Sequence, residues 1–85
     1  MPKISEFLGI IIMMFYDEHN PPHFHAKYQN YDIIVEIETG IIKGKFPPRA
    51  TRLVLEWHEK HKEELQSNWL RATRGEELAR IEGLE

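Results

Sequence analysis

The sequence predicts an α+β domain in which an antiparallel meander of three to four strands packs against one long or broken C-terminal helix. Two observations lead to this fold class. Residues 9–46 are rich in β-branched and aromatic residues and are divided by glycine, proline and polar turns. From Ala50 onward, apolar residues instead recur at the spacing of one helix face. With 85 residues, the chain is expected to form a single domain over residues 1–85 with a modest core.

The strands are predicted from local pattern and punctuation. Ile10–Tyr16 is apolar on both alternating faces, which is typical of a central strand covered on two sides. Residues 17–22 have the composition of a turn, because consecutive prolines remove backbone donors. His23–Tyr28 and Tyr31–Glu38 are expected to form a hairpin across a two-residue polar connection. Ile41–Phe46 is predicted to supply a fourth strand.

One long helix is predicted from Ala50 to Arg74. Pro48 suits the first turn of such a helix, and Gly75 suits its C-terminal cap. The helix would be longer than the globular average, so a bend or break is expected near residues 63–67. Its buried face is expected to comprise Ala50, Val54, Trp57, His61, Leu65 and Trp69.

Two further expectations concern the helix histidines and the last residues. His61 lies on the apolar stripe and is expected to be a hydrogen-bonded core histidine, whereas His58 is expected to be solvated. Their i, i+3 spacing is also compatible with shared ligation of a metal, which is the alternative. Residues 77–85 are expected to add a short edge strand through Leu78 and Ile81.

Composition excludes several classes of function. Without cysteine, the chain has no disulfide, thiolate metal site or cysteine nucleophile, so histidine must carry any metal chemistry. The apolar run at residues 9–16 is far shorter than the roughly 20 residues of a membrane helix. No cleavable signal precedes this run. We therefore expect a cytoplasmic protein without a membrane partner. The net charge of −3 argues against tight non-specific binding of nucleic acid. A basic stretch that could contact phosphate nevertheless contains Lys43, Lys45, Arg49 and Arg52.

The segment HNPPHFHA, from His19 to Ala26, concentrates the chemistry of this chain. His23 and His25 are two positions apart, so on a strand they project from one face and could share a metal or a phosphate. The preceding Pro-Pro turn could fold His19 or Asp17 back as a third ligand. Histidines with one carboxylate match the open sites of zinc and non-haem iron enzymes. The candidate ligands of a divalent metal are therefore His19, His23 and His25, the alternative being histidines that only make structural hydrogen bonds.

The same histidines could act without a metal. The candidate catalytic residues are His23, His25 and His19. The candidate binding residues are Tyr28, Arg49, Arg52 and His61. In a small ribonuclease, the imidazoles would serve as general acid and base, a tyrosine would assist, and an arginine would hold the phosphate. The alternative, favoured by the acidic total charge, is that the arginines form a solvated face at the start of the helix.

Six segments spread over nearly the whole chain form a recognisable pattern: residues 2–5, 7–10, 19–26, 37–40, 55–57 and 68–69. In these segments the chain resembles the small bacterial proteins of the Domain of Unknown Function 4160 family, and HNPPHFHA is the most specific of them. His19, His23, His25 and His61 match the family pattern. His58 and Met13 depart from it, and the departure at His58 argues against a metal pair formed by the helix histidines.

The resemblance also implies a kind of function. Members of that family look like partners in two-gene units similar to toxin–antitoxin pairs, which implies a protein that binds a small cognate protein partner. The functional surface would then be the face of His23 and His25 together with the Pro-Pro turn. Excess apolar residues on the first strand additionally favour a homo-oligomer. The alternative is an enzyme, either a metal-dependent hydrolase or a ribonuclease, that uses His19, His23 and His25.

Overall fold

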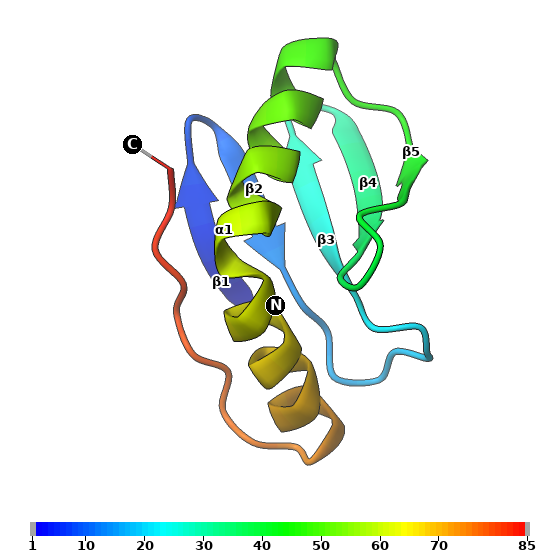
Figure 1. Ribbon diagram of the computed structural model, residues 1–85, viewed down its shortest axis with the longest axis vertical. Helices are drawn as coiled ribbons and strands as arrows, with labels where there is room; N and C mark the ends of the chain where they lie inside the picture. The colour runs from blue at the N-terminus through cyan, green and yellow to red at the C-terminus, as the bar shows by residue number, and fades with distance from the viewer. Residues whose placement is uncertain (1, 85) are drawn as a thin grey trace.

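The computed structural model describes residues 2–84, which form one five-stranded antiparallel sheet followed by one helix (Figure 1). The order of strands in the sheet is the order in the chain, so each strand pairs with the next in a meander. The strands are β1 (Lys3–Phe7), β2 (Ile10–Met13), β3 (His23–Tyr28), β4 (Tyr31–Glu36) and β5 (Ile42–Gly44), and the helix is α1 (Pro48–Thr73). The predicted α+β fold, a meander with a long C-terminal helix, is confirmed. No helix within residues 2–84 is long and apolar enough to cross a membrane.

Strand β1 is an addition to the predicted meander. It pairs with β2 across a tight turn in which Leu8 and Gly9 both have positive φ, 51° and 82°. The pairing register shifts between Lys3 and Ser5, so that neighbouring residues are buried together instead of alternating. This bulge removes the period-two signal by which the strand would otherwise have been found.

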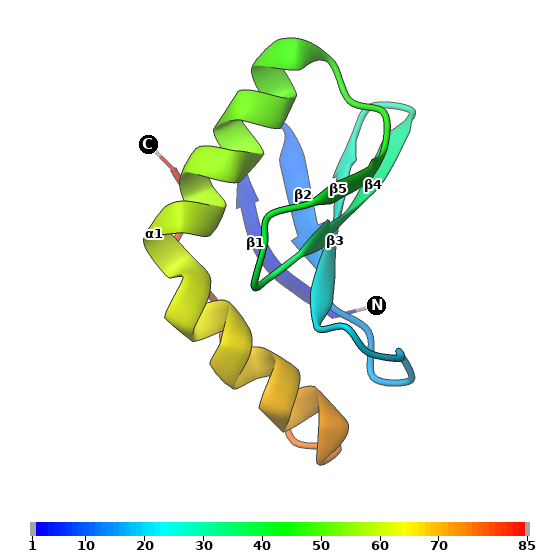
Figure 2. The ribbon, with the colours of Figure 1, turned by 45° about the vertical axis from the view of Figure 1, so that its right-hand side comes forward.

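Helix α1 covers one face of the sheet (Figure 2). The core between these two layers includes Ile10, Ile12, Phe24, Ala26, Val35, Val54, Trp57 and Leu65, each no more than 4% exposed. Strand β2 was expected to be covered on both sides, but only one of its faces lies under the helix. On its other face Met13 is buried and Ile11 is half-buried. The strand also ends at Met13, three residues earlier than predicted, because Phe15 and Tyr16 enter the loop that leads to β3.

The helix bends at His61, which has non-helical φ and ψ of −122° and 23°, two residues before the segment 63–67 near which a bend or break was predicted. The expectation for the two helix histidines is reversed. His58 is buried at 4% exposure and its Nε2–H donates to the carbonyl of Ile37 at 2.6 Å. The His61 side chain is partly exposed and lies 2.5 Å from the Glu64 carboxylate. The reason is that the end of β4 offers a buried carbonyl to His58, a partner that helical periodicity cannot reveal.

Residues 76–84 return from the end of α1 as extended chain whose last part lies beside β1, without forming the predicted edge strand (Figure 1). Residue 85 lies outside the described residues. Between this tail and β1, Ile81 N–H donates to the carbonyl of Ile4 at 2.8 Å. Side chains of α1 hold the tail in place. The Asn68 amide donates to the carbonyl of Ala79 and accepts from its N–H, and Trp57 Nε1–H donates to the carbonyl of Glu82. The tail is therefore fixed by the helix more than by strand pairing.

Candidate metal centre

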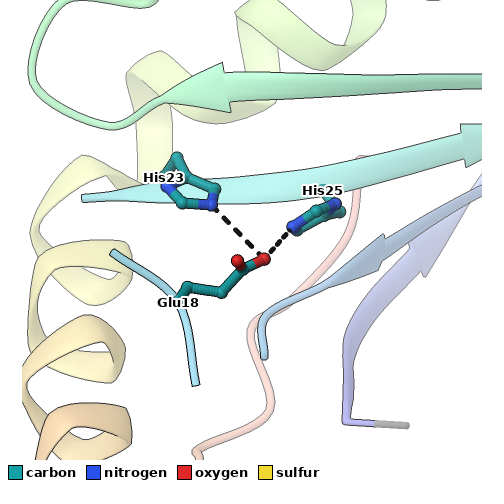
Figure 3. Close-up of side chains that lie close together, drawn as sticks. All are labelled: Glu18, His23 and His25. Carbon is teal, nitrogen blue, oxygen red and sulfur yellow. Dashed lines mark hydrogen bonds and ion pairs between the residues drawn. The ribbon is translucent and has the colours of Figure 1, made fainter. Parts of the chain in front are cut away.

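His23 and His25 project from the face of β3 that points away from the core. Phe24 and Ala26, which alternate with the two histidines along the strand, are fully buried under α1. Because successive side chains of a strand point to opposite faces, both imidazoles lie on the other face of the sheet. The loop between β2 and β3 then folds Glu18 against these imidazoles (Figure 3). Pro22, the last residue of this loop, is anchored to the end of β4, because its carbonyl accepts a hydrogen bond from Ile37 N–H at 3.0 Å. The shared face of the two histidines is as the sequence predicted.

The three side chains form one cluster, hereafter the Glu18–His23–His25 centre. Glu18 Oε1 lies 2.5 Å from His25 Nε2 and 3.4 Å from His23 Nε2. One ligand atom from each residue lies within 4.8 Å of the others. The side chains of Glu18, His23 and His25 are 28%, 11% and 25% exposed to solvent. The cluster is therefore shielded but still accessible to solvent.

A backbone carbonyl determines the tautomer of His23. Its Nδ1 lies 2.8 Å from the carbonyl oxygen of Pro21, which can only accept, so Nδ1 carries the proton. In the neutral ring, the Nε2 lone pair then faces Glu18 Oε1, another acceptor, at 3.4 Å. Two acceptors facing each other require a proton or a cation between them. Donation of the remote ring N–H to a carbonyl is also the usual arrangement of a metal-ligating histidine.

Aromatic rings hold both imidazoles in place. Phe15 meets the His25 ring edge-on at 4.6 Å between centroids, and Trp69 lies 5.2 Å from the His23 ring. The two imidazoles are themselves 5.4 Å apart. Trp69 was expected first as a core residue, which it is, and Phe15 as part of a strand. Their position beside the histidines depends on how the loop and the helix end pack.

The charge of Glu18 is stabilised by its neighbours. The hydrogen bond from His25 is the largest of the effects that hold the pKa of Glu18 below its ordinary value. Partial burial opposes this lowering of the pKa, and the contact with His23 adds to it. The carboxylate is therefore ionised near neutral pH, as metal coordination requires.

The ligand types and one of the two measured ligand separations suit a small divalent ion. In a tetrahedral site with metal–ligand distances of about 2.0–2.1 Å, ligand atoms are about 3.3 Å apart. The Glu18–His23 separation of 3.4 Å already matches this value, and the Glu18–His25 separation of 2.5 Å would have to increase. Two imidazole nitrogens and one carboxylate oxygen are ligands for zinc, iron or manganese. The donor set therefore fits such an ion.

A shallow depression of about 520 Å³ adjoins the centre. It is lined by Pro2, Phe15, Tyr16, Asp17, Glu18 and His25. Of the three side chains, Glu18 and His25 line this depression, so the centre is accessible to solvent there. The lining contains one further carboxylate, that of Asp17, and no lysine or arginine.

Glu18 is the residue that the sequence interpretation passed over in favour of His19 or Asp17. His19 is exposed and is not part of the three-residue group found among the described residues. Asp17 is exposed and lines the depression. The type of group, two histidines and one carboxylate, was anticipated. Which acidic or imidazole side chain of the turn would reach β3 depends on the path of the loop, which no local pattern reports.

The remaining candidate residues lie elsewhere. Tyr28 is at the far end of β3 from His23, about 17 Å away at the usual rise per strand residue. Tyr28 and Arg49 line a separate cavity near the start of α1, and Arg52 is exposed one turn further along the helix. His61 lies at the bend of α1. The arginines are therefore not beside the imidazoles that they were expected to assist.

A five-stranded meander with one long helix, and a two-histidine, one-carboxylate centre on its third strand, define this protein as a small α+β domain with a candidate metal site. The family model described as "Domain of unknown function (DUF4160)" matches residues 9–70, and the chain belongs to this family. The resemblance noted in the sequence is thereby confirmed, and the matched region includes the whole centre. No curated protein and no solved structure matches the chain.

Proposed function

We propose that this protein is a metal-dependent hydrolase whose divalent ion is held by Glu18, His23 and His25. The observation that carries the proposal is the orientation of His23. Its Nδ1–H is committed to the Pro21 carbonyl, so its Nε2 lone pair is directed at a carboxylate oxygen. Glu18 and His23, together with His25, would hold a divalent cation that satisfies both acceptors.

The arrangement supports hydrolysis rather than a purely structural role. When bound, the ion would supply a coordinated water of lowered pKa as nucleophile. Structural zinc sites use four protein ligands, whereas catalytic zinc sites use three and keep one coordination position open. This centre offers three protein ligands beside a depression and so resembles the catalytic kind. Phe15 and Tyr16 would restrict water on one side of this depression. Asp17, on its lining, is the carboxylate that we assign as proton acceptor.

The surroundings of the centre favour a substrate without phosphate. No basic side chain lines the depression, and the neighbouring carboxylate of Asp17 would repel a phosphodiester. Arg49 and Arg52, the residues expected to hold a phosphate in a ribonuclease, lie towards the other end of β3. We therefore favour hydrolysis of an uncharged or cationic carbonyl compound over metal-free or metal-dependent cleavage of RNA.

Elemental analysis of untagged protein tests the metal centre. After loading with zinc, iron(II) or manganese(II) and removal of excess, we expect about one ion per chain in the parent and in His19→Ala, which removes an exposed neighbouring histidine. Glu18→Gln and the double variant His23→Ala, His25→Ala should lose that ion. Metal absent from the loaded parent, or retained by the double variant, would overturn the proposal. Loss of metal in His19→Ala with retention in Glu18→Gln would replace Glu18 by His19 as the third ligand.

Binding of a cognate protein partner is the second function that we propose, within a bacterial, cytoplasmic, toxin–antitoxin-like two-gene unit. A partner of this kind would cover large apolar side chains that remain more than half exposed, namely Leu8, Ile41 and Leu70 at 53%, 54% and 53%. A second copy of the chain is the alternative partner. Co-expression with the neighbouring gene product should give a stable complex in gentle purification, and consistent failure to co-purify would count against a partner of this kind.

A further inference from the structure

A second cavity, of about 230 Å³, lies at the end of the sheet remote from the metal centre. Leu8 and Tyr28 form its sheet side, and Pro47, Arg49 and Leu53 form its helix side. We call it the Leu8–Arg49 pocket. Its wall is apolar apart from the Arg49 guanidinium and the Tyr28 hydroxyl. The volume is below the roughly 300–1,000 Å³ of sites that enclose a whole small molecule, so the pocket suits a single side chain.

Leu8 is an unusual residue for its position at the rim of this pocket. Its φ of 51° lies in the left-handed region, where glycine and asparagine are favoured and a branched apolar side chain is strained. The side chain is nevertheless 53% exposed. A leucine at this position thus stabilises neither the hairpin turn nor the core. We infer that its side chain makes a contact outside the chain.

Arg49 brings an unbalanced positive charge to the same pocket. Neither Arg49 nor its neighbours Lys45 and Arg52 form an ion pair with any residue in the part of the chain that the structure describes. Arg52 follows Arg49 by three positions and so lies beside it on the helix surface. In a chain with a net charge of −3, this end of the molecule is locally basic.

We propose that the Leu8–Arg49 pocket docks a segment of a protein partner in which an apolar side chain stands beside a carboxylate. The apolar side chain would contact Leu8, Tyr28 and Leu53, and the carboxylate would pair with Arg49. An apolar wall with one charged group fits such a peptide better than nucleic acid, whose binding rests on several phosphate contacts. The inference rests on the partner binding proposed above, to which it gives a location and a chemistry, and it is independent of the metal centre.

Selection of random peptides displayed on phage against the full chain tests the chemistry. Enriched peptides should place aspartate or glutamate within two residues of leucine, isoleucine or phenylalanine. For a synthetic consensus peptide, Arg49→Glu should weaken binding by at least about tenfold in fluorescence polarisation. Arg74→Glu, the same charge reversal at the other end of α1, should change binding less than about twofold. Peptides without an acidic residue, or equal affinity for Arg49→Glu, would overturn the proposal.

Leu8→Asn separates docking from folding. It creates an Asn-Gly turn, the preferred sequence for a two-residue hairpin with two positive φ angles, so the variant should be at least as stable as the parent. It should still weaken the consensus peptide by at least about fivefold, because the apolar contact is lost. Unchanged affinity in Leu8→Asn would overturn the proposal, as would Arg49-dependent binding of a uridine decamer tighter than that of any selected peptide. A neighbouring gene product that co-purifies equally with Arg49→Glu would refute this location while leaving partner binding intact.

Discussion

His23 illustrates how a single backbone carbonyl can determine side-chain chemistry. The Pro21 carbonyl takes the Nδ1 proton, and the opposite nitrogen is thereby left as an acceptor. Glu18 must then either share a proton with the imidazoles or share a cation with them. The hydrogen bond between Glu18 and His25 contributes to the stability of the metal-free protein, and this contribution depends on pH.

Glu18→Gln should destabilise the metal-free protein in a pH-dependent way. The pKa of Glu18 is lowered in the folded state, chiefly by the hydrogen bond from His25, so its charge stabilises the fold above the unfolded-state pKa of about 4.3. That stabilisation is lost as the pH falls through the lowered pKa. We expect a cost of roughly 1 kcal/mol near neutral pH that disappears on acidification.

Urea unfolding in the presence of a chelator, from pH 3 to pH 8, measures this difference. Asp17→Asn is the control, because it removes an adjacent carboxylate for which the structure shows no side-chain hydrogen bond in the described residues. A cost in Glu18→Gln that stays constant over the whole pH range would show that the carboxylate charge is not responsible.

At the scale of elements, helix α1 organises the molecule through side chains that reach backbone groups. His58 satisfies the Ile37 carbonyl just beyond the end of β4, and Asn68 satisfies both backbone groups of Ala79 in the tail. The bend at His61 lies between these two residues. One helix thus fixes two segments that lie outside the strands of the sheet.

His58→Ala should be more damaging than His61→Ala. Removing His58 leaves a buried carbonyl unsatisfied and takes away the ring stacked on Phe24, for an expected cost of about 2–3 kcal/mol. Removing the partly exposed His61 should cost less than about 1 kcal/mol. Chemical denaturation of the two variants measures both values, and a larger cost for His61→Ala would contradict the packing described here.

Asn68→Ala should release the tail. The Asn68 side chain is 1% exposed and makes hydrogen bonds of 2.8 and 2.9 Å with Ala79, so its loss should cost about 2–3 kcal/mol of unfolding free energy. Hydrogen exchange should accelerate at the amides of residues 76–84 before it does in β3. Ser67→Ala, at the adjacent exposed position, serves as the control and should have little effect. Equal protection of the tail in Asn68→Ala would show that the Asn68 hydrogen bonds are not what holds it.

At the scale of the whole molecule, the two proposed sites lie at opposite ends of β3. His23 and His25 begin the strand beside the acidic depression, and Tyr28 ends it beside the basic start of α1. Substitutions at one end should therefore leave the other unchanged. The charges are separated in the same way: acidic side chains lie at the end where we propose a cation site, and basic ones at the end where we propose docking of an acidic partner.

Metal should stabilise the entire fold, because the ligands come from a strand and from the loop before it. At a metal concentration one hundred times its dissociation constant, linkage predicts about 2.7 kcal/mol of stabilisation. For a domain of this size, that corresponds to a rise in Tm of roughly 10–20 °C. Calorimetry with added zinc chloride should show this rise in the parent and not in the His23→Ala, His25→Ala variant. An equal rise in both would assign the metal to another place.

Local periodicity by itself determined most of the architecture. The alternation of His23, Phe24, His25 and Ala26 placed both imidazoles on one face of a strand, and the stripe from Ala50 to Trp69 placed the helix on the sheet. These features depend on repeats of 2.0 and 3.6 residues, which a chain carries in its own sequence. The meander follows because successive strands joined by short turns pair with their neighbours.

Tertiary structure alone decided which polar groups meet. Glu18 rather than His19 reaches β3, His58 rather than His61 is buried, and the tail lies on β1 without pairing as a strand. Each of these outcomes depends on a partner distant in sequence or on the closure of a loop, and neither leaves a periodic signal. Strand β1 was not predicted because its bulge interrupts the two-residue repeat from which a strand is recognised. The sequence therefore supplied the chemical groups of the centre, and the path of the chain between β2 and β3 selected the three that converge.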